Sequence, residues 1–298
     1  MRKKRFHEPL VELIFRASSV ITIVAVGFIV LFILSKGIQP FLHNNKEGTY
    51  SFFKFISGLE WRPNDDINTA QYGILYMIVG SIFATGGAII IGVPISIFAA
   101  AYLSELASEK VKKIVKAGVM LLAGIPSVIY GIFGLGFIVP RIREISPMPQ
   151  GQSLLAVIIV LTMMILPTMI VISENAIASV PKAYRNASYA LGASKVYTTI
   201  HVIIPAARRG ILVGVILGVG RAIGEAMAVV LIAGNVSGGI PTSIFDPIRP
   251  LTTNVVLEMS YATGLHSEML FATGSILMVF IIAINLLLSS LIKRMGKY

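Results

Sequence analysis

The sequence predicts an all-α membrane protein with six transmembrane helices. Of its 298 residues, 55% are hydrophobic and only 13% are charged, and the mean hydropathy is +0.83. A soluble domain of this length needs far more charged surface. A helix that crosses the hydrocarbon of a bilayer needs about 20 mostly apolar residues. Stretches of this kind occur at about 17–38, 71–103, 114–139, 153–179, 207–233 and 266–292.

We interpret the first stretch as a helix that is retained in the protein. It follows Arg2-Lys3-Lys4-Arg5, as in a signal peptide, but it is too long, and residues 36–40 lack the small residues of a cleavage site. Residues 39–70 then form an outside loop whose aromatic side chains are typical of the membrane interface. The second stretch exceeds a simple span, so we expect it to tilt, to kink near Pro94 or to protrude.

The distribution of basic residues orients the chain. With the N-terminus inside, 17 of the 25 Lys and Arg lie in cytoplasmic segments, 7 lie outside and Arg221 lies in a span. Cytoplasmic loops carry such an excess of basic residues, so we expect both termini in the cytoplasm. The net charge of +11 therefore requires no nucleic-acid partner. The absence of cysteine excludes disulfides, thiolate metal sites and cysteine nucleophiles.

The third stretch contains candidate helix breaks at Gly124, Pro126 and Gly131. Proline removes one backbone hydrogen bond, and glycine lets a neighbouring helix approach or the helix open. Broken helices beside a translocation path are common in transporters. A packing kink between tightly apposed helices is an equally good interpretation of this segment alone.

A polar, amphipathic segment lies between the fourth and fifth stretches. Pro181 suits the start of a helix, and Ala183, Ala187, Ala190 and Leu191 give that helix an apolar side. A helix built into a cytoplasmic loop predicts a docking site for a soluble partner. The alternative is a generic amphipathic helix that lies on the membrane surface.

This segment resembles the coupling motif of ABC importer permeases. The motif there is Glu-Ala-Ala, three residues, Gly, nine residues, Ile, one residue, Leu-Pro. The same spacing holds here in Asn186-Ala187-Ser188, Gly192, Val202 and Ile204-Pro205. Asn186 replaces the acidic residue, which puts one polar contact with the ATPase in doubt. The resemblance implies that the ATPase is contacted by Tyr184, Asn186, Ala187, Ser188, Leu191 and Gly192.

The fifth stretch carries two charges, Arg221 and Glu225. If one helix spans 211–233, these residues share a face, with Arg221 near the middle. An arginine at the bilayer centre costs about 2.5–3.5 kcal/mol on insertion scales, so it faces a partner, the bundle interior or water. We favour a translocation pathway over a structural ion pair. The planar donors of arginine suit an oxyanion such as phosphate or sulfate, and Glu225 would keep its binding weak.

Residues 70–292 are similar to the phosphate-specific (Pst) ABC importer permeases, and to the PstC-type subunit in particular. The segments that carry this resemblance are 102–105, 124–131, 184–193 and 220–228. The resemblance implies a type I ABC importer permease fold, with residues 71–292 as the transmembrane domain between segments 1–70 and 293–298. It implies a PstA-like second permease, two ATP-binding subunits and an extracytoplasmic phosphate-binding protein as partners. No cofactor is expected.

Three alternatives to a phosphate permease remain open. The nearest is a permease for another oxyanion, such as molybdate or sulfate, because the chemistry of arginine alone does not select phosphate. An ion-coupled secondary carrier or channel would not need the segment at 181–205. An intramembrane enzyme lacks support, since the sequence has neither a His-Glu-x-x-His nor a Gly-x-Ser-x-Gly motif, and no P-loop for ATP hydrolysis.

The predicted topology can be tested by labelling single cysteines in this cysteine-free chain. Residues 39–70, 140–152 and 234–265 should lie outside, so Asn45→Cys and Ser243→Cys should react with an impermeant thiol reagent added to intact cells. Lys195→Cys should react only after permeabilisation. External labelling of Lys195→Cys in sealed cells would contradict this arrangement.

Overall fold

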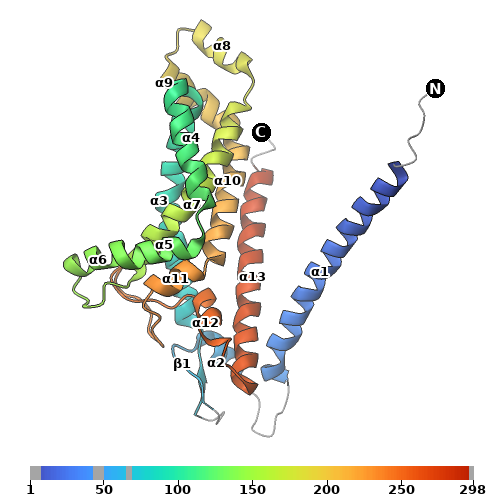
Figure 1. The fold of residues 1–298 in the computed structure, drawn as a ribbon, viewed down its shortest axis with the longest axis vertical. Helices are drawn as coiled ribbons and strands as arrows, with labels where there is room; N and C mark the ends of the chain where they lie inside the picture. Colours follow the sequence, from blue (N-terminus) through green and yellow to red (C-terminus); the bar gives the residue numbers. More distant parts are fainter. Residues whose placement is uncertain (1–7, 43–49, 65–68, 295–298) are drawn as a thin grey trace.

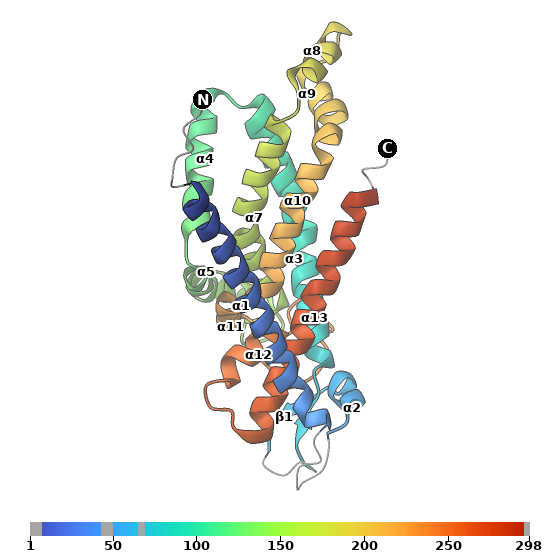
Figure 2. The ribbon, with the colours of Figure 1, turned by 90° about the vertical axis from the view of Figure 1, so that its right-hand side faces the viewer.

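The computed structural model describes residues 8–42, 50–64 and 69–294, and these form an elongated bundle of helices (Figures 1 and 2). Parts of the two predicted tails, residues 1–7 and 295–298, lie outside the described residues. Two parts of the predicted outside loop, 43–49 and 65–68, also lie outside them. Six long helices make up most of the described structure. These are α1 (Glu8–Leu42), α3 (Leu75–Ala101), α4 (Glu109–Gly124), α7 (Leu154–Ala178), α10 (Ile204–Gly224) and α13 (Gly264–Arg294).

Shorter elements join or cap these helices. The short α-helices are α2 (Phe52–Ser57), α5 (Ser127–Phe133), α6 (Val139–Ile145), α8 (Lys182–Ala190), α9 (Lys195–Thr198), α11 (Met227–Ile232) and α12 (Leu251–Glu258). The π-helical turns are η1 (Tyr102–Leu106), η2 (Gly134–Ile138) and η3 (Thr199–Ile203). Strands β1 (Trp61–Arg62) and β2 (Gln71–Tyr72) form an antiparallel pair in which Trp61 lies opposite Tyr72.

In the described part of the chain, five helical segments are long and apolar enough to cross a membrane, and the bent segment at 109–145 makes a sixth. The fourth and sixth predicted stretches match α7 and α13 to within two residues. Helix α1 is longer than predicted, because it begins at Glu8. The second stretch is shorter at its start, where residues 71–72 form β2, and α3 continues through Pro94 into η1.

The core is formed by α3, α7 and α10, which run side by side (Figures 1 and 2). Glycines let these helices approach closely. A Cβ on Gly87 would lie 2.5 Å from the Ile158 side chain, and one on Gly218 would lie 2.6 Å from Met169. Small residues at such contacts are typical of helices that pack in lipid, where no hydrophobic force drives helices together.

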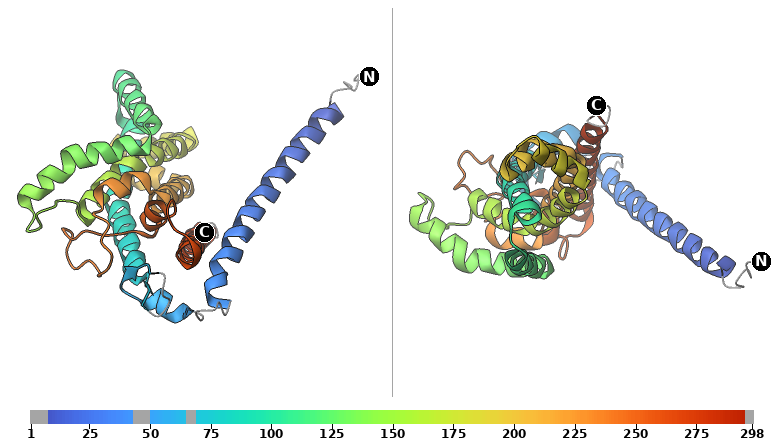
Figure 3. Two further views of the ribbon diagram at one scale, coloured as in Figure 1. Left: turned by 60° about the horizontal axis from the view of Figure 1, so that its bottom comes forward. Right: turned by 90° about the horizontal axis from the view of Figure 1, so that it is seen from above.

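Helix α1 diverges from this core (Figure 3). It contacts α13 near its C-terminal end, where the Ser275 hydroxyl donates a hydrogen bond to the Ile33 carbonyl at 3.1 Å. Apolar side chains along the rest of α1 are exposed, for example Leu13 at 63% and Ile23 at 72%. In a membrane, this surface would contact lipid or a neighbouring subunit.

A buried polar cluster closes the end of the bundle opposite α8. The Glu258 carboxylate accepts hydrogen bonds from Trp61 Nε1 and pairs with His266 Nε2, each at 2.7 Å, and it also forms an ion pair with Arg249. This carboxylate, on the last residue of α12, therefore joins β1, the segment just before α12 and the start of α13. Buried charges are tolerated when they are paired and hydrogen-bonded in this way.

The third predicted stretch, 114–139, is a bent pair of helices, and its break lies at the predicted Gly124 and Pro126. Helix α4 begins at Glu109 and ends at Gly124, and the segment Ser127–Ile145 continues from it at an angle of 98°. Proline disfavours the helical conformation in the residue before it, and Ile125 is extended accordingly, with ψ at 127°. Helices α5 and α6 run crosswise to the long helices, and α6 projects beyond the side of the bundle (Figure 1). Helix α6 occupies part of the predicted outside segment 140–152.

The contact between α5 and α11 can be tested with two glycines. A Cβ on Gly131 would lie 2.8 Å from Ala228 Cα, whereas one on Gly136 would meet no atom within 4 Å. Overpacking costs about 1–3 kcal/mol, so Gly131→Leu should lower the thermal unfolding midpoint of the detergent-solubilised chain, and Gly136→Leu should not. Equal midpoints for the two variants would contradict this packing.

Candidate functional site

Helix α8 projects at one end of the bundle, between α7 and α10 (Figure 1). Pro181 precedes its first residue, as the sequence predicts, and the Pro181 carbonyl accepts a hydrogen bond from Tyr184 N at 3.1 Å. Within α8 only Ser188 is buried. The predicted apolar side, formed by Ala183, Ala187, Ala190 and Leu191, is exposed, and Leu191 reaches 89%. An exposed apolar helix face at the end of a bundle is suited to contact a partner.

Gly192 ends α8 by reversing the chain. It has a φ of +82°, in the left-handed region that glycine occupies without strain. Its N–H donates to the Tyr189 carbonyl at 2.9 Å, and Ala193 N donates to the Ser188 carbonyl at 3.2 Å. This pair of bonds is the Schellman motif, which satisfies the last carbonyls of a helix. No other part of the described chain approaches the position of a Cβ on Gly192, so the conformational requirement explains this glycine.

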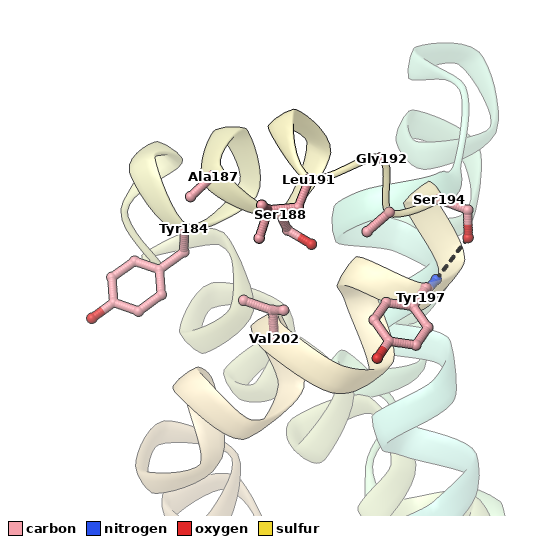
Figure 4. A pocket seen from close by; sticks show the side chains of 9 residues that line it. Tyr184, Ala187, Ser188, Leu191, Gly192, Ser194, Tyr197 and Val202 are labelled. Atoms are coloured by element: carbon pink, nitrogen blue, oxygen red, sulfur yellow. Dashed lines mark hydrogen bonds between the residues drawn. The ribbon is translucent and has the colours of Figure 1, made fainter.

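A hollow of about 760 Å³ opens between α8, α9 and η3 (Figure 4). The predicted coupling residues that line it are Tyr184, Ala187, Ser188, Leu191 and Gly192, together with Ala193, Ser194, Tyr197 and Val202. The remaining predicted residue, Asn186, is exposed on α8 but does not line the hollow. The Ser194 hydroxyl caps α9 by accepting a hydrogen bond from Tyr197 N at 3.2 Å.

Arg185 attaches α8 to the rest of the bundle. Its Nη2 lies 2.5 Å from Glu105 Oε1, and its Nε lies 3.0 Å from Glu105 Oε2. The same guanidinium donates to the carbonyls of Val180 and Ile177 at the end of α7, at 2.5 and 3.0 Å. The hydrogen bonds that Arg185 donates to the Glu105 carboxylate raise the pKa of Arg185 above its usual range, so the link is charged at all physiological pH values.

The prediction that Arg221 and Glu225 share one helix face is wrong. Helix α10 ends at Gly224, and Glu225 is extended, with φ at −77° and ψ at 126°. After this break α11 begins at Met227, so 207–233 is not one continuous helix. Instead of pairing with Arg221, the Glu225 carboxylate accepts a hydrogen bond from Ala228 N at 3.2 Å.

Helix termini stabilise both charges. Arg221 lies in the last turn of α10, where the helix dipole favours a cation, and Glu225 caps the first turn of α11, where the dipole favours an anion. Arg221 Nη1 donates to the Thr168 hydroxyl of α7 at 3.1 Å. None of the ion pairs within residues 8–42, 50–64 and 69–294 includes Arg221.

A small cavity adjoins Glu225. Its volume of about 10 Å³ is roughly what one water molecule requires. Its polar lining consists of Glu225, Ser81 and Thr85 of α3, and Thr252 of α12. The Thr252 hydroxyl also donates to the Glu225 carbonyl at 3.0 Å, which satisfies a carbonyl released by the helix break.

The helices that follow the two breaks, α5 and α11, pack against each other. Gly124 ends α4 and Pro126 precedes α5, while Gly131 of α5 packs directly on Ala228 of α11. The Tyr130 hydroxyl donates to the Leu122 carbonyl at 2.8 Å and so satisfies the end of α4. The predicted break lies at Gly124 and Pro126. The prediction of a break at Gly131 is wrong, because Gly131 lies inside α5, where it contacts the segment that follows Arg221 and Glu225.

The sequence matches a known transport family over most of this architecture. Residues 92–297 match the family described as "binding-protein-dependent transport system inner membrane component". The chain belongs to this family. It is therefore a permease subunit of an ABC importer, a multi-span protein of the inner membrane, and ATP hydrolysis is carried out by a separate ATPase. This membership replaces the secondary carrier and the intramembrane enzyme as alternatives.

Curated relatives and solved structures agree with this assignment. The permease is 38% identical to the probable ABC transporter permease YqgH of Bacillus subtilis, over 95% of this chain and 90% of the relative. It is 31% identical to the phosphate transport permease PstC of Mesorhizobium japonicum, over 89% and 83%. A bacterial alginate ABC importer shares the fold, with a TM-score of 0.63 at 15% identity, over 96% of this chain and 99% of that one. The inward-facing MetNI methionine transporter gives 0.55 at 19%, over 75% and 94%. The type I importer fold is thus confirmed.

Several residues of this permease site are not predictable as a site from the sequence. Glu105, Thr168 and Thr252 lie 80, 53 and 27 positions from the residues they bind. Their partners are set by helix packing, which leaves no local signal in the chain. One signal was present for Glu105, because it ends the segment 102–105 that is similar to the Pst permeases.

The conformation of Gly192 gives a test of how α8 ends. A residue with a Cβ pays roughly 1–2 kcal/mol in the left-handed region, whereas asparagine tolerates it better. Gly192→Ala should therefore speed amide hydrogen exchange over 182–193, and Gly192→Asn should do so less. Equal exchange in both variants and the parent would show that the turn does not constrain α8.

Proposed function

We propose that this permease imports inorganic phosphate, with ATP hydrolysis on a separate ATPase driving its alternation between inward-open and outward-open states. The observation that carries the proposal is Arg221. It lies within a membrane-spanning segment, and its only hydrogen bond among the described residues is to the neutral hydroxyl of Thr168.

An arginine in this position favours an anionic cargo. A cation without a counter-ion is costly inside a membrane, and the C-terminal dipole of α10 offsets only part of that cost. A guanidinium presents planar donors that bind an oxyanion through two parallel hydrogen bonds. An anion that passes Arg221 would compensate its charge during transport.

Glu225 would prevent that anion from staying bound. Because Glu225 caps α11 instead of pairing with Arg221, the arginine donors remain available to cargo, while the nearby carboxylate lowers the attraction for an anion. Transport requires binding that is favourable but weak.

The coupling part of the proposal rests on α8. Its exposed apolar face and the hollow beside it would receive the ATPase, through Tyr184, Ala187, Ser188, Leu191 and Gly192. ABC importer permeases work with a second permease, ATPase subunits and a binding protein. For this chain we propose a PstA-like permease, two ATP-binding subunits and an extracytoplasmic phosphate-binding protein. The α8 end and both termini would face the cytoplasm, as the basic residues predict.

The choice of phosphate over molybdate or sulfate rests on sequence. Relatives named PstC are 26–31% identical to this chain, and the segment 220–228 is similar to the Pst permeases. YqgH, at 38% identity, carries no substrate in its name. A permease for another oxyanion is therefore the alternative function, and it would use the same arginine.

The role of Arg221 can be tested in the complete transporter. Arg221→Gln retains hydrogen-bonding capacity toward Thr168 and removes the charge. Uptake of labelled phosphate should fall by at least about tenfold, as expected for losing one charge-assisted contact, while the amount of assembled complex stays the same. Thr168→Val is the matched control, because it removes the partner hydroxyl and keeps the charge; its uptake should fall less.

The double variant Arg221→Gln with Glu225→Gln separates transport from structure. If the two residues were a structural pair, the double variant would regain assembly and uptake. The structure gives them separate partners, so uptake should stay low. Near-normal phosphate uptake by the double variant would end the assignment of Arg221 to the pathway.

A further inference from the structure

We propose that the ion pair between Arg185 and Glu105 transmits the movement of α8 to the two helices that contact Arg221 and Glu225. This inference rests on the proposed function of α8 as the docking site of the ATPase. It assigns to Arg185 and Glu105 a positioning role that is distinct from contact with the ATPase or with cargo.

Helix α8 has few side-chain attachments to its own bundle. Its side chains are exposed except for Ser188, which is buried, and Arg185, which is partly buried. The Ser188 hydroxyl lies 2.8 Å from the Thr198 hydroxyl and so joins α8 to α9. Arg185 alone among the α8 side chains reaches the ends of α3 and α7 through described hydrogen bonds. Besides the backbone connection through residues 179–181, force applied to α8 therefore reaches those two helices through one guanidinium.

This guanidinium is held at a fixed angle. The Arg185 and Glu105 side chains are only 15% and 7% exposed. Two nitrogens of Arg185 contact the Glu105 carboxylate. The same side chain donates to the Ile177 carbonyl in the last turn of α7 and to the Val180 carbonyl just after it. A planar guanidinium bound to four acceptor oxygens can transmit both rotation and translation of α8. An apolar contact could slide and would transmit less. Lysine is a point charge and cannot reproduce this geometry.

The helices that Arg185 joins are those that reach the charged residues of the pathway. Helix α3 leads directly into η1, which contains Glu105. Near the opposite end of α3, Ser81 and Thr85 line the cavity at Glu225. Helix α7 ends beside Ile177, and its Thr168 binds Arg221. Because α3 and α7 also pack against each other along their length, a displacement of α8 would move both contacts together.

The test uses the complete transporter, with its second permease, ATPase and binding protein, in proteoliposomes. Arg185→Leu should leave assembly and ATP hydrolysis in place, and the phosphate imported per ATP hydrolysed should fall by about tenfold, within the range typical of coupling between two sites. Arg16→Leu is the matched control, because it breaks an ion pair of the same 2.5 Å length whose side chains are 75% and 63% exposed. Unchanged import per ATP in Arg185→Leu would overturn the proposal.

A charge-swapped variant, Arg185→Glu with Glu105→Arg, covers the case in which Arg185→Leu fails to assemble. The swap keeps the opposite charges but reverses which side chain faces the carbonyls of α7. It should restore assembly while import per ATP stays low. If the swapped transporter assembles and transports normally, or if neither variant assembles, the link is structural only and the proposal is wrong.

Thiol labelling, which needs no phosphate, tests the role of the Arg185–Glu105 pair separately from the identity of the cargo. Met227 is 52% exposed, two residues after Glu225, and Met227→Cys is a single reactive thiol in this cysteine-free chain. Adding ATP and vanadate to the assembled complex should change its rate of labelling by a small thiol reagent, and Arg185→Leu should abolish that change. A complex that shows this difference but imports no phosphate would contradict phosphate as the cargo. It would leave the proposed role of the Arg185–Glu105 ion pair intact. An unchanged response in Arg185→Leu would refute the link.

Discussion

The structure depends on the requirement that backbone groups inside a membrane find partners within the protein. Hydrocarbon supplies no hydrogen bonds, so a spanning segment is helical unless side chains or other backbone groups replace the missing bonds. This permease breaks two helices, and at both breaks a side-chain hydroxyl binds a carbonyl that the helix leaves free. Tyr130 satisfies the Leu122 carbonyl at the first break, and Thr252 satisfies the Glu225 carbonyl at the second. At each break, therefore, a hydroxyl from elsewhere in the chain replaces one of the hydrogen bonds that the helix loses.

The second break determines the chemistry of the site. In a continuous helix Arg221 and Glu225 would lie one turn apart and would neutralise each other. The break gives the arginine a helix C-terminus and the glutamate a helix N-terminus, so each charge is stabilised separately. An arginine that is stabilised without a carboxylate keeps its donors available to an anion. This arrangement also connects to α8, because α3 and α7 contact the break at one end and Arg185 at the other.

Hydropathy predicted the spans α7 and α13 to within two residues because the length of apolar helix is set by the thickness of the membrane. Local signals were also reliable at Pro181 and Gly192, where proline and glycine conformations dictate the start and end of α8. The sequence did not predict the break at Glu225, which no proline marks. That break is held by Thr252 and Ala228 through contacts formed only in the folded bundle. The partner of Arg185, 80 residues away, was hidden for the same reason.

The most direct test of the account is ATP-dependent uptake by proteoliposomes that contain the permease with its second permease, its ATPase and its binding protein. Labelled phosphate, sulfate and molybdate should be offered separately on the side of the membrane that carries the binding protein. Each should be tested with and without ATP on the side that carries the ATPase. Phosphate should accumulate only when ATP is present, and sulfate and molybdate should stay at background. Uptake of sulfate or molybdate in preference to phosphate, or phosphate uptake that is independent of ATP, would contradict it.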